Sequence, residues 1–195
     1  MEKMPIEIAG YSQLEYLTVF NAIVFGVIAT EYFGGWGNML RFREGIKFYP
    51  LHFLWTVFSF FTLIQNWFGI WPRVEFINNN VLYFFYSLVP MFVFHLLSVM
   101  LFPNSRPVAK MNFKTFYFRN SRVFFIIYSL YFLVAIGGSF VYEDLGDVFK
   151  QNIVRGGGFI LSLCCAYFNK NAILHYLFLA ISFAGLAQFL LLIPK

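Results

Sequence analysis

The chain has 195 residues, of which 60% are hydrophobic, 23% are aromatic and only 12% are charged. In soluble proteins about a quarter of the residues are charged, so the charges of this chain are too few to cover a surface that faces water. The composition excludes an ordinary soluble domain and predicts an all-α integral membrane protein. The formal net charge of +5 does not require a nucleic-acid partner, because cytoplasmic loops of membrane proteins are themselves rich in Lys and Arg.

Six apolar stretches follow one another along the chain, each close to the roughly 20 residues that cross the hydrocarbon core of a bilayer. Gly34-Gly35 is expected to end the first helix, and Pro50 stands at a favoured first helical position of the second. The predicted transmembrane helices are 14–33, 50–71, 81–102, 123–142, 148–168 and 172–193. They form a six-helix bundle, and one polytopic membrane domain accounts for residues 1–195.

The orientation of this bundle follows from its basic residues, because Lys and Arg favour cytoplasmic loops. The opposite side carries only Lys3, Arg73, Lys150 and Lys195 in its connections and ends. We therefore predict both chain termini on the extracytoplasmic side and expect the protein in the plasma (inner) membrane. The cations of the connections after the first, third and fifth helices are Arg41, Arg43, Lys47, Arg106, Lys110, Lys114, Arg119, Arg122 and Lys170.

The longest connection, 104–122, combines five basic residues with several aromatic ones. Such a segment is expected to lie at the membrane interface, with its rings in the headgroup layer and its cations near anionic lipid. The sequence thus predicts the lipid bilayer as a partner, with anionic lipid at this connection. Topology-setting charge combined with an aromatic belt is the simpler interpretation of the same residues.

Four ionisable residues share one predicted depth near the cytoplasmic boundary. Glu31 lies near the inner end of the first helix, His52 and His175 near the inner ends of the second and sixth, and His95 seven residues from the inner end of the third. At 1.5 Å per residue, all four fall within roughly 3 to 10 Å of one boundary. Because polar side chains in a membrane usually face the bundle interior or a water-filled cavity, they predict a ligand or proton pocket.

Smaller polar residues fall on the same helical faces as the histidines. Three of them follow His52 along the second helix at helical spacing, and the other two share faces with His95 and His175. This polar stripe is expected to face other helices and to support the pocket. Its members are Thr56, Ser59, Asn66, Ser98 and Ser182.

Several chemistries suit three imidazoles and one carboxylate. His52, His95, His175 and Glu31 are candidate ligands of zinc, iron or copper, a transmembrane His pair could ligate haem, and a free imidazole could relay protons. The pattern alone names no cofactor. The alternative is that Glu31, His52 and His175 reach the headgroups from helix ends, while His95 makes one interhelical hydrogen bond.

Arg155 is predicted inside the fifth helix, near the extracytoplasmic face, where a cation is costly without a partner. Asp147 precedes it by two turns, after Glu143 and Asp144, and outer-face ion pairing with Asp147 is expected to offset the desolvation of the guanidinium. The run Gly156-Gly157-Gly158 that follows would permit a close helix contact or a break in the helix.

Enzymatic motifs are missing from the sequence. Ser139 and His175 are predicted near opposite membrane faces, which excludes a serine–histidine catalytic pair, and no HExxH or phosphate-loop motif occurs. The sequence therefore favours a non-enzymatic binding, transport or accessory subunit. A partner subunit and a homo-oligomer are the assemblies that such a role allows. A membrane metal or haem redox enzyme and a structural subunit of a larger complex are the alternatives.

Overall fold

Apolar runs separated by proline, asparagine and charged segments fold into helices throughout the chain. The computed structural model describes residues 13–70, 81–103, 111–142 and 145–192. Within them the α-helices are α1 (Gln13–Arg41), α2 (Pro50–Phe68), α4 (Val81–Leu101), α5 (Phe113–Tyr142), α6 (Leu145–Tyr167) and α7 (Ala172–Leu192). The prediction of an all-α protein with six helices is confirmed.

Four of these helices are long and apolar enough to cross a membrane, which makes the chain an integral membrane protein with several spans. Polar side chains interrupt α2 along one stripe, and the first half of α6 carries Lys150, Gln151, Asn152 and Arg155. These two helices are not among the four. The four qualifying segments are Glu15–Arg41, Val81–Leu101, Phe113–Phe140 and Ala172–Phe189.

The predicted end of the first helix at Gly34-Gly35 is wrong, because α1 continues to Arg41. A glycine in a helix costs only about 1 kcal/mol relative to alanine, and here packing against α4 outweighs that cost. Gly35 lies against the ring of Phe102, and a methyl group at Gly35 would overlap that ring, whereas a methyl group at Gly34 would meet nothing. Absence of a side chain at Gly35 therefore allows the extended helix to approach the end of α4.

The predicted start of the fourth helix at Val123 is also wrong, because α5 begins at Phe113. Asn112 caps this helix: its Oδ1 accepts from the backbone N–H groups of Lys114 (3.0 Å) and Thr115 (3.4 Å). Phe113, Phe116 and Tyr117 are then buried at helical spacing. The expectation that the rings of this segment lie in the headgroup layer fails for these three, since they pack into the protein.

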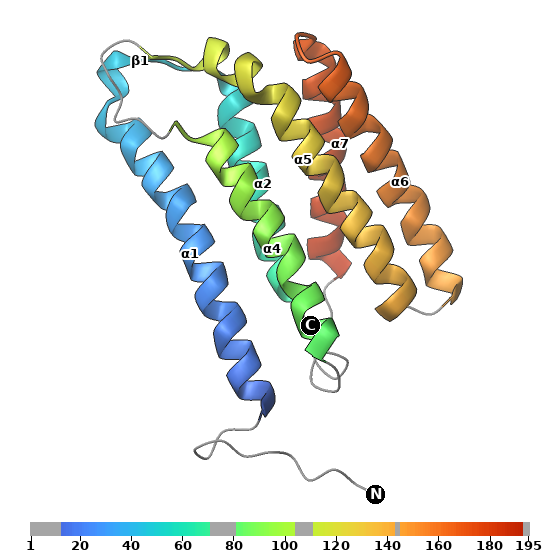
Figure 1. Cartoon of the computed structure of the whole chain (residues 1–195). Coiled ribbons are helices and arrows are strands. Elements are labelled where there is room, and N and C mark those ends of the chain that lie inside the picture. The colour runs from blue at the N-terminus through green and yellow to red at the C-terminus, as the bar shows by residue number, and fades with distance from the viewer. Residues whose placement is uncertain (1–12, 71–80, 104–110, 143–144, 193–195) are drawn as a thin grey trace, which may run out of the picture.

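Each helix runs opposite to the one before it, and the helices form two layers in which α2 and α7 lie behind α1, α4, α5 and α6 (Figure 1). The 3-10 turn Arg43–Gly45 and strand β1 (Ile46–Lys47) join α1 to α2, and β2 (Met111–Asn112) precedes α5. β1 and β2 pair in parallel, with Ile46 opposite Met111. We call this end of the bundle, with segments 42–49, 102–103, 111–112 and 168–171, the basic end.

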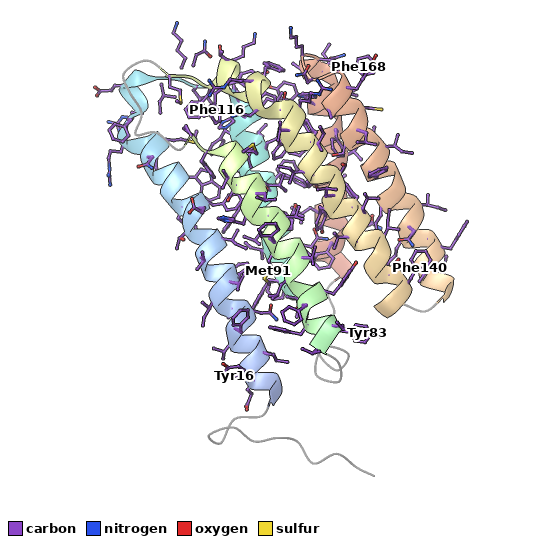
Figure 2. The ribbon with its side chains drawn as sticks, in the orientation of Figure 1. Tyr16, Tyr83, Met91, Phe116, Phe140 and Phe168 are labelled. Atoms are coloured by element: carbon purple, nitrogen blue, oxygen red, sulfur yellow. The ribbon has the colours of Figure 1, made fainter. Side chains whose placement is uncertain are left out.

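Aromatic rings fill the core where α2, α5 and α7 meet. Trp55 of α2 is fully buried and contacts Phe125 of α5 and Phe178 of α7, with ring centroids 5.1 and 5.6 Å apart. Edge-to-face ring pairs of this kind add about 0.5–1.5 kcal/mol each beyond the burial of their surface. Other side chains project away from the helices, and apolar ones such as Phe140 near the lower end (Figure 2) form the surface expected to contact lipid.

The glycine pair provides a test of the extended α1. Gly35→Ala should destabilise the protein by about 1–3 kcal/mol, because the added methyl group displaces Phe102 from a packed core. Gly34→Ala is the matched control and should be neutral or stabilising by up to about 1 kcal/mol through helix propensity. Thermal unfolding of both variants in detergent checks this, and equal melting temperatures would contradict the packing described for Gly35.

Candidate functional site

His52 lies near the start of α2, inside the bundle at the basic end. Its side chain is only 1% exposed, and Nε2 lies 2.8 Å from the backbone oxygen of Leu101 at the end of α4. Because a carbonyl can only accept, Nε2 carries the proton and donates. The ring lies against Phe113, with centroids 4.7 Å apart, and Nδ1 is buried without a hydrogen-bond partner among the described residues.

His175 lies in the first turns of α7 and is fully buried. Its Nε2 donates to the backbone oxygen of Cys165 in α6 at 3.2 Å, so in the neutral ring Nδ1 is left as an acceptor. The hydroxyl of Tyr117 in α5 is 2.9 Å from that Nδ1 and donates to it. Both ring nitrogens are therefore satisfied, and one imidazole joins α5, α6 and α7.

Tyr117 contacts both histidines. Its ring centroid is 5.6 Å from that of His175 and 6.3 Å from that of His52. The indole N–H of Trp55 is buried without a hydrogen-bond partner among the described residues. The structure thus brings His52 and His175 into contact with the same tyrosine, in a shell of aromatic rings.

Glu31 and His95 do not join this group. Glu31 is exposed on α1, and His95 is half-buried on α4, with its Nδ1 buried and without a hydrogen-bond partner in the described part of the chain. The alternative that His52 and His175 reach the headgroups is wrong, because both side chains turn inward and are buried. In residues 13–70, 81–103, 111–142 and 145–192, no three His, Cys, Asp or Glu side chains are grouped to hold a metal ion.

Two members of the polar stripe of α2 form hydrogen bonds with α1. Trp36 of α1 donates from Nε1 to the hydroxyl of Thr56 at 2.8 Å, and that hydroxyl donates to the backbone oxygen of Phe53. One turn further, the hydroxyls of Tyr32 and Ser59 are 2.7 Å apart. These two members of the stripe therefore face a neighbouring helix and are engaged in contacts between helices.

The other members of the stripe have separate environments. Ser98 is buried and donates to the backbone oxygen of His95 in its own helix at 2.7 Å. Asn66 is half-buried near the far end of α2, and its Nδ2 has no hydrogen-bond partner among the described residues. Ser182 is half-buried on α7. These three side chains are thus distributed along the bundle.

Arg155 is held by its own helix. Its Nη2 donates to Oε1 of Gln151 at 2.6 Å, and its Nη1 lies 3.3 Å from Oδ1 of Asn152. The side chain of Asp147 lies outside the described part of the structure, as do Glu143 and Asp144. Helix α6 runs unbroken through the three glycines, and Gly158 touches the ring of Phe132, so at this position the run provides a close contact between α5 and α6.

A small pocket at the basic end, which the sequence did not predict, lies between α1, β1 and the residues that lead into α5. It encloses only about 20 Å³, and the volume reaches about 320 Å³ only when the space open to solvent is included. The nearest sequence signal was Gly34-Gly35, which we interpreted as a helix end although Gly35 lies in the pocket wall. The lining residues are Gly35, Asn38, Met39, Ile46, Phe102, Pro103, Met111 and Phe113.

His52 contacts two of the segments that line this pocket. Its ring packs on Phe113, and its Nε2 donates to the carbonyl of Leu101, the residue before Phe102.

Comparison of the chain with protein-family models, curated proteins and solved structures finds no match. The fold and composition define the class: a multi-pass helical membrane protein.

The tyrosine that contacts both histidines can be tested by removing its hydroxyl. Tyr117→Phe should lower stability by about 1–3 kcal/mol, because Nδ1 of buried His175 loses its donor and no water replaces it. Tyr176→Phe is the matched control, since Tyr176 is 40% exposed, and it should change stability by less than about 0.5 kcal/mol. Denaturant unfolding in mixed micelles measures both, and an unaffected Tyr117→Phe protein would show that this bond adds nothing to stability.

Proposed function

We propose that the chain is a non-enzymatic, membrane-embedded binding protein whose binding site is the pocket at the basic end. The observation that carries the proposal is the coupling of that pocket to His52: one imidazole contacts the ring of Phe113 and fixes the backbone beside Phe102. A pocket with walls fixed in advance loses less conformational entropy when a ligand binds. His52 acts here as a positioning residue.

The proposed site includes only one of the four ionisable residues that were expected to share a pocket. Of the four ionisable residues, His52 is the one that touches the pocket lining, whereas His175 is fully engaged with Tyr117 and the Cys165 carbonyl. Glu31 and His95 are not among the lining residues. Nothing in this arrangement favours transport over binding, so the proposal is limited to a binding or accessory role.

A stoichiometric bound molecule would test this role. We expect native mass spectrometry, after mild detergent purification and incubation with a lipid and metabolite extract of the host membrane, to show one adduct per chain. Met111→Trp should lose the adduct, because the indole fills the pocket. Val154→Trp, which adds the same side chain at a position 75% exposed, should keep it. A folded wild-type protein without any adduct would refute the binding proposal.

We also propose that all six helices of this single domain cross the plasma membrane and that both termini lie outside. The support is the antiparallel course of the helices (Figure 1) and the described cations at the basic end, where loops of cytoplasmic type would lie. Orientation decides which aqueous compartment faces the pocket, so it bears directly on the ligand.

Cysteine labelling of intact cells tests this orientation. A Lys170→Cys variant should react with a membrane-impermeant maleimide only after permeabilisation, whereas Gln13→Cys should react in intact cells. The parent chain, whose two cysteines are Cys164 and Cys165, gives the background. Labelling of Lys170→Cys in intact cells would reverse the proposed orientation.

A further inference from the structure

Two of the four ionisable residues predicted at one depth, Glu31 and His95, have no polar partner in the described part of the chain. Glu31 is exposed on α1 and forms no hydrogen bond or ion pair with any described residue. His95 is half-buried on α4, and its Nδ1 is buried without a hydrogen-bond partner among those residues. The cation of α1 is Arg41, ten residues or roughly 15 Å beyond Glu31. The carboxylate therefore has no counter-charge within reach on its own helix.

Both residues lie at the depth of the hydrocarbon core. Helices α1 and α4 run in the same direction toward the basic end (Figure 1), where Gly35 contacts the ring of Phe102. Counted from this contact, Glu31 is four residues deeper in the bundle and His95 is seven, which is roughly 6 and 10 Å along the helices. Helix α4 has 21 residues, just enough to cross the core. The contact at its end therefore marks the boundary, and the two side chains lie inside it.

Neither side chain is directed toward the nearest headgroups. The Cα–Cβ bonds of a helix tilt toward its N-terminus, and the N-terminal ends of α1 and α4 lie at the opposite end of the bundle from the basic end (Figure 1). Glu31 and His95 thus extend deeper into the core. A carboxylate that faces lipid without a partner is costly, so a hydrogen-bond donor at the same depth outside the chain would stabilise it.

Both residues also lie along the line where α1 and α4 meet. Glu31 lies one turn, and His95 two turns, before the residue of its helix that forms the Gly35–Phe102 contact, so each shares a helical face with that contact. Apolar side chains one turn away from each residue are exposed. They are Val27 on α1 (58% exposed), and Phe92 and Val99 on α4 (61% and 40%). The chain thus presents a carboxylate and an imidazole within an exposed apolar surface.

We infer that this surface binds a second copy of the chain about a two-fold axis normal to the membrane. Such an axis keeps every residue at its own depth, and in a contact of this symmetry each residue of a pair meets the other residue in the second copy. Glu31 and His95 differ by only about 4 Å in depth, so they can meet twice. Because Nδ1 of His95 is buried, Nε2 is the nitrogen that donates to the carboxylate of the other copy. The two bonds give both carboxylates a partner, and the contact does not involve the pocket at the basic end.

Energy transfer between labelled chains tests the inference. Donor-labelled and acceptor-labelled wild-type protein are mixed in phosphatidylcholine vesicles, and we expect transfer that follows a monomer–dimer equilibrium as lipid dilutes the protein. Glu31→Leu and His95→Phe should each weaken dimerisation by about tenfold or more, because each removes both interhelical bonds. The double variant should be no weaker than either single variant, since all three lack the same bonds. Glu44→Gln, which removes an exposed acid from the 3-10 turn, is the control and should dimerise as wild type does.

Disulfide formation between chains locates the contact. Glu31→Cys with one affinity tag and His95→Cys with another are expressed together and oxidised in the membrane, and we expect a product that carries both tags. The parent chain with the same two tags gives the background. Ile160→Cys, at a position 61% exposed on α6, is the matched control and should not join His95→Cys. A monomeric wild type, undiminished dimerisation of Glu31→Leu, or absence of the product with both tags would overturn the inference.

Discussion

A buried polar atom inside a lipid-embedded bundle has no water to replace a missing partner, and this constraint determines how the helix ends at the basic end are joined. His52 bonds a carbonyl at the end of α4, and His175 bonds a carbonyl near the end of α6. The last carbonyls of a helix have no partner within the helix, and a neutral imidazole N–H satisfies such a group without adding charge. The histidines thus connect helix ends that would otherwise require solvent.

The aromatic core depends on the same connections. Trp55 is held among rings from α5 and α7, and those helices are fixed to each other by the Tyr117–His175 bond one to two turns nearer the basic end. Hydrogen bonds between helices fix how far each helix is shifted along the bundle axis, and this shift determines which rings pack against one another. The high aromatic content therefore has a structural use, because aromatic side chains from three helices pack against one another.

The sequence predicted the helical class, the number of helices and the residues at which α2 and α7 begin, because apolar length and proline positions are local properties. It misplaced the end of α1 and the start of α5 for a shared reason. Gly35 stays in the helix because it packs against Phe102, and Phe113 begins a helix because it packs against His52. Those partners are distant in sequence, so local breakers and charges gave the wrong boundary.

The candidate site was predictable only in part. Depth along each helix correctly placed His52 and His175 at the same end of the bundle, but their burial depends on Tyr117, which we had assigned to an interfacial loop. His95 seemed the most deeply placed histidine by depth along its helix, yet it is half-buried and its Nδ1 has no hydrogen-bond partner in the described chain. Helix rise gives the depth of a residue, whereas its direction around the axis also depends on how neighbouring helices pack.

The short parallel pair β1–β2 has a consequence for how the protein is made. Ile46 and Lys47 leave the ribosome before α2, whereas their partners Met111 and Asn112 emerge only after α4. During synthesis the basic end therefore stays open until three helices have been delivered to the membrane. The wall of the pocket is complete only when β2 has paired with β1. A ligand can therefore bind there only after the first three of these helices have been made.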